Sequence, residues 1–189
     1  MATSQRGAGA AGLTMWELDP AHTTVEFSAK HMMITTVKGR FSDVSGTIEA
    51  DEAHPDRSSA EASIDAASVD TRNEQRDTHL RSADFFDVEH NPVISFRSKR
   101  VEGAAGKAGD RFKVIGDLTI RGTTKEVTLD TTYEGKIRDM EGKERAGFSA
   151  TTSIDRRDFG LVWNQALETG GLLVGNEISI EIEAEAVEA

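Results

Sequence analysis

The stretch Glu177–Ala186, EISIEIEAEA, decides the fold of this 189-residue chain. Its apolar side chains alternate strictly with glutamate and serine, so one face of the segment is oily and the other is polar and mostly acidic. A period of two is the geometry of a β-strand, in which neighbouring side chains point to opposite faces. The segment is therefore predicted to be a strand that lays one face on an apolar interior and turns the other to water.

The same alternation returns along the chain and predicts a protein made mainly of strands. It covers residues 23–30, 41–50, 58–65, 111–120, 127–133 and 146–154, with shorter runs at 16–18 and 92–96. Because no linker interrupts the pattern, we expect one antiparallel all-β domain of about eight strands at residues 14–189. Residues 1–13 lack any stretch of Leu, Val, Ile or Phe and are predicted to form a disordered tail.

Two architectures fit such strands: two sheets stacked on a solid core, or one sheet rolled into a barrel. The inward-facing rows hold many small residues, which leave room between the walls. They are Ala29, Gly46, Ala50, Ala60, Ala62, Gly116, Ala150, Ala184 and Ala186. A sandwich core needs larger side chains to fill it, whereas an eight-stranded barrel can enclose one ligand. The small residues favour a barrel with a cavity, and the sandwich stays the alternative.

One segment departs from the period of two. Residues 71–74, TRNE, match a capping box, in which Thr71 caps the first helical turn and Glu74 reaches back to it. We therefore predict a helix from about Arg72 to Arg81, and it is the one helix that the sequence indicates clearly. An aromatic pair between acids, DFFD at residues 84–87, follows this helix.

Composition limits the partners and the location. The formal net charge is −11, and an acidic surface repels phosphate backbones, so nucleic acid is not an expected partner. The charge also argues against docking on anionic membranes by a general basic patch. No run approaches the roughly 20 apolar residues of a membrane span, and residues 1–13 lack the apolar core of a secretory signal. We therefore expect a cytoplasmic protein.

Motifs that carry chemistry in other proteins are missing or isolated. The chain has no cysteine and no G-x-S-x-G nucleophile motif, and no pair of its histidines has the spacing of a metal-binding helix. The triplet DFG at 158–160 lacks the other kinase motifs and fits a turn with a buried phenylalanine. We therefore expect no catalytic residue, no metal and no cofactor. The charged run 155–158, DRRD, indicates surface ion pairs or the polar rim of a barrel mouth.

Three motifs, in sequence order, resemble signatures of the YceI-like family, the lipocalin-like polyisoprenoid-binding proteins. They are THLRSADFFD at 78–87, GDLTIRGTTK at 116–125 and IDRRDFGL at 154–161. Residues 16–41 also look like the start of this family, through Asp19, His22, Phe27, His31 and Gly39. The resemblance runs from about Leu13 to Ala189.

The resemblance implies a long antiparallel barrel, similar to lipocalins, with one short helix near one end. It also implies an isoprenoid-type lipid in the barrel, polyprenyl or prenylated quinone-like, and some members of the family carry fatty amides. Members are often dimeric, so a homodimer is expected. Many members are exported, whereas this chain shows no signal, which favours the cytoplasmic branch.

We therefore predict non-catalytic binding of a long apolar lipid, for sequestration or transport. Inward phase and family position mark the residues expected to line or cap the cavity: Phe27, Phe41, Phe85, Phe86, Phe96, Leu118, Phe148, Ile154, Phe159 and Trp163, with Asn164, Arg157 and Asp158 near a polar head at the rim. Two alternatives stay open: an enzyme acting on an apolar substrate, and a filled-core structural or interaction domain. Only Thr131, Tyr133 and Thr152 are polar on the inward rows, which weighs against the enzyme.

Overall fold

The computed structural model describes residues 12–189, so most of the predicted tail, residues 1–13, lies outside the described residues. Eleven antiparallel strands belong to one sheet. They are β1 (Leu13–Leu18), β2 (Thr24–His31), β3 (Thr35–Phe41), β4 (Val44–Asp51), β5 (Ser59–Asp65), β6 (Val69–Asp70), β7 (Val93–Glu102), β8 (Asp110–Ile120), β9 (Thr123–Arg138), β10 (Glu144–Asp155) and β11 (Val174–Glu188). The α-helix is α1 (Glu74–Arg81), and short 3₁₀ turns span Pro55–Arg57, Ala66–Ser68 and Arg156–Phe159.

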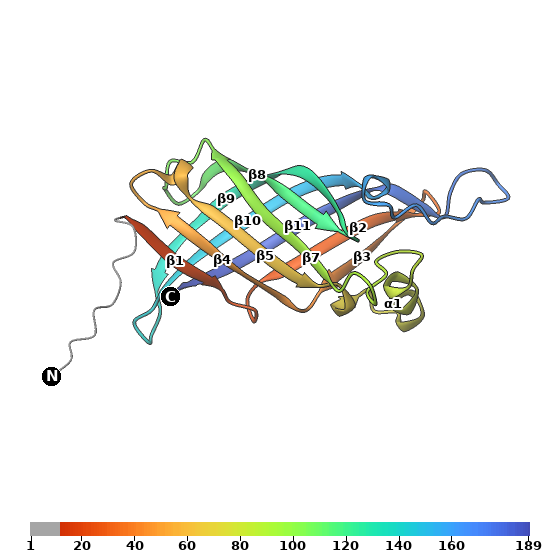
Figure 1. Ribbon diagram of the computed structural model, residues 1–189, viewed down its shortest axis with the longest axis horizontal. Coiled ribbons are helices and arrows are strands. Elements are labelled where there is room, and N and C mark those ends of the chain that lie inside the picture. Colours follow the sequence, from red (N-terminus) through yellow and green to blue (C-terminus); the bar gives the residue numbers. More distant parts are fainter. Residues whose placement is uncertain (1–11) are drawn as a thin grey trace.

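The sheet closes on itself and forms a barrel (Figure 1). The ring runs β1-β4-β5-β7-β8-β9-β10-β11, and β1 then pairs with β11, so eight strands complete it. The predicted all-β antiparallel barrel of about eight strands is thereby confirmed. Closure leaves the ring strands no open edge, and it gives every alternating strand a common inside.

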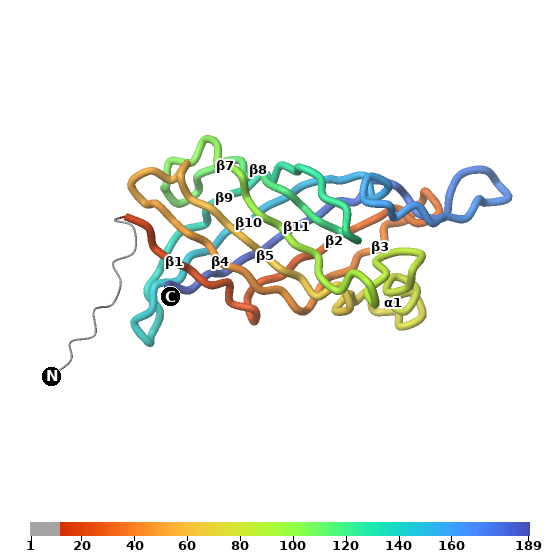
Figure 2. The backbone as a smooth tube through the Cα atoms, in the orientation of Figure 1, coloured from red at the N-terminus to blue at the C-terminus, as the bar shows by residue number. Residues whose placement is uncertain are grey.

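Three of the ring strands are extended by the three remaining strands. β1 and β2 follow one another along β11, because Leu18 pairs with Ala186 and Thr24 pairs with Glu183. In the same way β3 pairs with β2 while β4 pairs with β1, and β3 then pairs with β6 beyond the end of β5. The barrel is consequently elongated, with the C-terminus at the end opposite α1 (Figure 2).

The helix α1 lies beside one end of the barrel, as the resemblance implied (Figure 1). Its cap differs from the prediction: Asn73, not Thr71, accepts a hydrogen bond from the Arg76 N–H at 2.9 Å. Thr71 instead donates its hydroxyl to the buried Asp77 carboxylate at 2.6 Å. The helix therefore begins at Glu74, two residues later than predicted. The Thr71 hydroxyl cannot cap it because it is hydrogen-bonded to the Asp77 carboxylate.

Two packed clusters lie at the two ends of the interior. The larger one lies beside α1 and includes Phe41, Val69, Phe85, Phe159 and Leu161. The smaller one, at the opposite end, is built on Trp16, Ala146 and Ala186. In the part of the chain that the structure describes, no helix is both long enough and apolar enough to cross a membrane.

Candidate ligand-binding cavity

A cavity of about 560 Å³ lies within the barrel. Every strand of the closing ring contributes to its wall, and β2 and β3 contribute as well. The volume falls within the range of roughly 300–1,000 Å³ that is usual for small-molecule sites. The predicted hollow interior is therefore present, and a fully filled core is not what the structure has.

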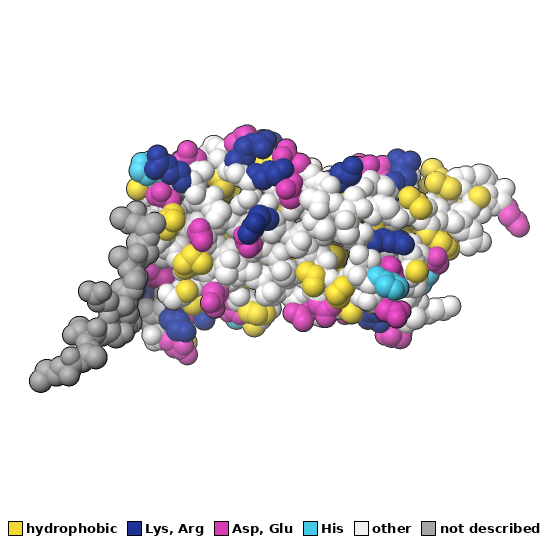
Figure 3. Space-filling model, in the orientation of Figure 1, with side chains coloured by type: hydrophobic (Ala, Val, Ile, Leu, Met, Phe, Trp, Pro, Cys, Tyr) yellow, Lys and Arg dark blue, Asp and Glu magenta, His cyan; other side chains and the backbone are white. Residues whose placement is uncertain are grey.

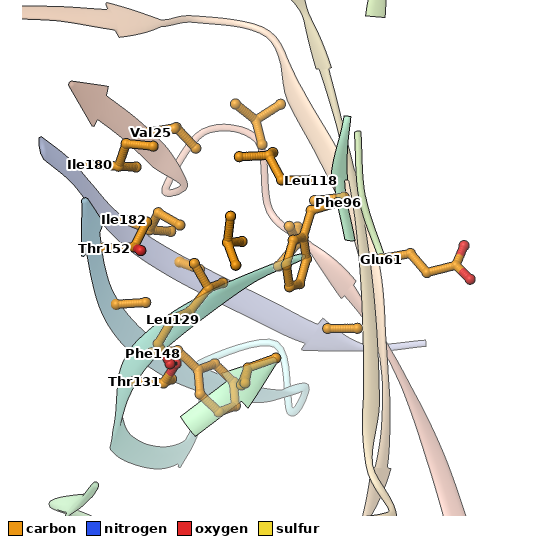
Figure 4. Close-up of a pocket in the computed structure, with 18 of the residues that line it drawn as sticks. Val25, Glu61, Phe96, Leu118, Leu129, Thr131, Phe148, Thr152, Ile180 and Ile182 are labelled. Carbon is orange, nitrogen blue, oxygen red and sulfur yellow. The ribbon is translucent and has the colours of Figure 1, made fainter. Parts of the chain in front are cut away.

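The wall of the cavity follows directly from the alternation in the strands. Leu118, Leu129, Ile180 and Ile182 lie around the space in Figure 4, whereas Glu61 points away from it. Outside the barrel, Glu61 pairs with Arg97 at 2.6 Å. The strands thus contribute apolar inner rows and more polar outer rows, because a period of two places alternate side chains on opposite faces.

Small side chains keep the space open. Ala60 and Ala62 of β5 face it, as do Ala150 of β10 and Ala184 of β11. Gly46 and Gly116 sit where an added Cβ would collide with a neighbouring backbone oxygen, so at both positions the sheet approaches itself too closely for a side chain. These positions were among the small inward residues noted in the sequence.

Polar groups on the wall are few in the middle and more frequent at the ends. Thr131 and Thr152 face the interior in Figure 4, and the Thr131 hydroxyl donates to the Leu129 carbonyl at 3.2 Å. Burial raises the pKa of the nearby Tyr133 phenol, which keeps it neutral. At the end opposite α1, Lys136 pairs with Glu52 at 2.7 Å. The middle of the cavity therefore offers a surface suited to hydrocarbon.

Trp16 also lines the cavity near that end, and it is buried. Its indole N–H is the one buried side-chain polar atom that lacks a hydrogen-bond partner within residues 12–189. The Lys136 ammonium lies 5.9 Å from the centre of the indole ring.

Arg156 is a buried structural residue that the sequence did not single out. It was part of a charged run predicted to lie on the surface or at a rim, but its side chain is buried. Its guanidinium donates to the carbonyls of Leu161 at 2.7 Å, Trp163 at 2.8 Å and Gly175 at 2.9 Å. Burial lowers the pKa of Arg156. Arg156 fixes the path of the chain around the α1 end of the cavity. Its role depends on carbonyls that come together only when the loop folds, so the sequence pattern does not indicate it.

Nine of the predicted lining residues face the cavity, and two do not. The nine are Phe27, Phe41, Phe85, Phe86, Phe96, Leu118, Phe148, Ile154 and Phe159. Trp163 lines a second cavity instead. The Asn164 side-chain N–H donates to the Val174 carbonyl at 2.7 Å, and the Val174 N–H donates to the Asn164 side-chain oxygen at 3.1 Å. Asn164 lines neither cavity. Arg157 pairs with Asp155 at 2.6 Å and is exposed.

The second cavity, of about 550 Å³, lies between α1, the end of β2 and the loop before β11. It shares Phe27, Ala29, Leu80, Phe85 and Val174 with the first cavity, so one wall separates the two spaces. The His79 ring stands edge-on to Phe85 at 5.0 Å and to Trp163 at 4.6 Å between ring centres. The α1 end of the interior is thus lined with aromatic rings.

A charged cluster joins the strands where β1 gives way to β2. Asp19, His22 and Glu185 place potential ligand atoms within 4.8 Å of one another. Arg145 already supplies a positive charge there, donating to Asp19 at 2.9 Å and to Glu185 at 2.6 Å. The hydrogen bonds from His22 and Arg145 lower the pKa of Asp19 to about 2, and Asp19 in turn raises the pKa of His22. These ion pairs link the turn between β1 and β2 to β10 and β11.

Comparison with known proteins gives relatives for nearly the whole chain. UPF0312 protein SA2479 of Staphylococcus aureus strain N315 is 38% identical over 174 residues, which is 92% of this chain and 97% of that protein. A Staphylococcus epidermidis relative, UPF0312 protein SERP2314, is 37% identical over the same length.

Solved structures share the fold. BcnA of Burkholderia cenocepacia matches with a TM-score of 0.76 and 25% identity, over 89% of this chain and 98% of that one. The YceI protein of Campylobacter jejuni matches with a TM-score of 0.70 and 34% identity, over 85% and 90%. A polyisoprenoid binding domain from Saccharophagus degradans, 16% identical with a TM-score of 0.68, shares the fold over 92% and 98%. The model of the YceI-like domain matches residues 16–186, so this chain belongs to the YceI-like family.

Proposed function

We propose that this protein binds the tail of a long apolar lipid of the isoprenoid type inside its barrel and does not alter it chemically. The observation that carries the proposal is the cavity of about 560 Å³ inside the closed ring of strands, with an apolar wall contributed by every ring strand. A solved structure of the same fold is called a polyisoprenoid binding domain, which makes a polyprenyl or prenylated quinone-like ligand a fitting choice.

The energetics suit such a ligand. Burying one methylene group stabilises by roughly 0.8 kcal/mol, so a five-carbon isoprene unit contributes about 3–4 kcal/mol before the costs of binding. Ordering of the chain and loss of translation offset a large part of this. A tail of several units therefore binds tightly without polar contacts, and its selectivity follows from the length and width of the space.

Sequestration or transport fits the wall better than catalysis. A reaction needs a titratable group within hydrogen-bond reach of the reacting atom. The middle of the cavity presents Thr131 and Thr152, whereas Lys136, Glu52 and Arg156 lie at its ends in ion pairs or carbonyl contacts. The curated relatives carry family names and no enzyme names.

The proposal is tested by native mass spectrometry of protein purified from cells without detergent. We expect a co-purifying apolar molecule whose mass identifies its chain length and head group. In the variant Ala150→Phe a ring occupies the space beside Phe148, and the bound fraction should fall at least about tenfold.

The matched control is Thr151→Phe, which places the same ring one residue further along β10 on the exposed outer face. It should retain the bound lipid. If the purified protein is empty and takes up no prenylated quinone from solution, or if Ala150→Phe binds as well as the parent, the cavity is not the binding site.

The homodimer and the cytoplasmic location stay predictions from the sequence and the family resemblance. Light scattering coupled to size exclusion measures the mass in solution, and fractionation of cells measures the location. A monomeric mass at micromolar concentration would contradict the predicted homodimer and leave the proposed lipid binding in the cavity unaffected.

A further inference from the structure

The hairpin between β2 and β3 carries apolar side chains in solvent. Its three-residue loop is Met32, Met33 and Ile34, and relative exposure reaches 67% for Met33 and 79% for Ile34. Exposed large apolar residues that lie together mark an interaction site more often than scattered ones do. The loop is therefore a candidate contact surface.

Turn geometry does not account for these residues. Met32 and Met33 have φ values of 51° and 63°, in the left-handed region. Asn and Gly adopt that region readily, whereas a long side chain with a Cβ is strained there. Strained residues at an exposed turn indicate a role beyond forming the turn itself.

A second segment extends the same surface. Val162 and Leu172, in the loop before β11, are also exposed. The two segments are joined because the Met32 N–H donates to the Leu173 carbonyl at 2.8 Å, and a Cβ added to Gly171 would collide with the Met33 sulfur. We call Met32, Met33, Ile34, Val162 and Leu172 the apolar tip. Hydrophobic side chains gather at this end of the molecule in Figure 3.

The hairpin of the apolar tip is positively charged, opposite in sign to the whole chain, whereas the loop that carries Val162 and Leu172 holds one exposed acidic residue, Glu168. The net charge of the protein is −11, yet residues 28–40 contain Lys30, Lys38 and Arg40 and no acidic residue. Arg40 lies 3.7 Å from Asp70. Lys30 and Lys38 are exposed and form no ion pair within the described chain, residues 12–189. An apolar loop flanked by lysines that form no ion pair is complementary to an anionic lipid surface.

The apolar tip also lies next to the interior. Lys30, His31, Leu173 and Val174 line the second cavity, which shares a wall with the main one. A lipid leaving a bilayer at this end would meet the aromatic lining around His79 and then the hydrocarbon surface of the barrel.

We propose that the apolar tip docks on the surface of an anionic lipid bilayer, with Met33 and Ile34 entering the headgroup boundary and Lys30 and Lys38 facing the phosphates. This goes beyond the proposed function, which it serves as the step where lipid is exchanged. A symmetric contact between two copies is disfavoured because it would set the lysines of one hairpin against those of the other.

The experiment is flotation of the lipid-free full chain with phosphatidylcholine vesicles, with and without about one third phosphatidylglycerol. We expect binding to the anionic vesicles only. The double variant Met33→Asn/Ile34→Asn should lower binding by about tenfold or more. Asn tolerates the left-handed region at position 33 better than Met, so the variant should fold.

Matched controls lie at the opposite end of the barrel. Ile137 and Met140, 68% exposed and fully exposed, form an equivalent pair around the turn between β9 and β10. Ile137→Asn/Met140→Asn should leave vesicle binding unchanged. Lys30→Gln/Lys38→Gln should lower it by about fivefold per lysine, and Lys107→Gln/Lys143→Gln should not.

Each alternative outcome overturns the docking proposal. The tip is not a membrane site if the parent protein does not bind the anionic vesicles. The same conclusion follows if Met33→Asn/Ile34→Asn and Ile137→Asn/Met140→Asn lose vesicle binding equally. It also follows if Met33→Asn/Ile34→Asn changes the mass in solution and leaves flotation unchanged. The last result would assign the tip to a second copy. Ala150→Phe should still float with anionic vesicles, so a failure of lipid uptake and a failure of docking remain distinguishable.

Discussion

The α1 end of the barrel holds a cluster of tightly buried side chains beside the second cavity, whereas its middle is hollow, although both are made from the same alternating strands. Beside α1, the inward residues are large, and Phe159 and Val69 are completely buried. In the middle, Ala60 and Ala62 of β5 and Ala150 of β10 line the cavity with small side chains. The difference teaches that alternation builds the wall, while side-chain volume and the capping segments decide whether the wall encloses a core or a cavity.

The largest expected effect on stability comes from removing one phenylalanine ring beside α1 and, for comparison, one in the middle of the barrel. Phe159→Ala should destabilise the protein by about 3–5 kcal/mol, because it opens a cavity in a packed cluster. Phe96→Ala should cost less, about 1–2 kcal/mol, because part of that ring already faces the empty space. Guanidinium unfolding of lipid-free protein measures both changes. Equal losses would mean that the middle is as tightly packed as the end.

The converse substitution sharpens the comparison on a single strand. Ala184 and Ala186 are two residues apart on the same face of β11, but Ala184 faces the cavity and Ala186 is fully buried near Trp16. Ala186→Phe should destabilise by about 1–3 kcal/mol through overpacking. Ala184→Phe should be close to neutral in stability and should displace lipid. Thermal unfolding and native mass spectrometry of both variants would show whether the boundary lies between them.

The smallest effect concerns the charges at that same boundary. Asp19 has a folded pKa of about 2 against 3.8 unfolded, so its stabilisation is complete above pH 3.8 and is lost as the pH falls toward 2. The pKa of His22 is raised above 6.5, so its contribution is complete below pH 6.5 and is lost as the pH rises through the folded value.

Asp19→Asn should therefore lower Tm most between about pH 4 and 6.5, with a smaller difference on either side. A titration of His22 followed by NMR should show its pKa moving back toward 6.5 in the variant. A Tm difference that stays constant from pH 2 to 9 would show that Asp19 acts by packing and not by charge.

The comparison also explains which site residues could be predicted. Phe96, Leu118, Phe148 and Ile154 sit on long alternating strands, so their inward position follows from their phase alone. Trp163 and Asn164 lie in the loop before β11, where no periodicity fixes direction, and the expectation for them rested on family position. Neither faces the main cavity.

By itself the sequence determined the eight ring strands and β2, their inner and outer faces and the apolar character of the interior, because the period of two is a local property of the chain. It did not indicate β3 or β6 as separate strands. Only the tertiary structure decided the second cavity, the buried contacts of Arg156 and the joining of Met33 to the loop at Gly171. Each of these depends on segments far apart in the chain meeting at one end of the barrel, and no local pattern encodes such a meeting.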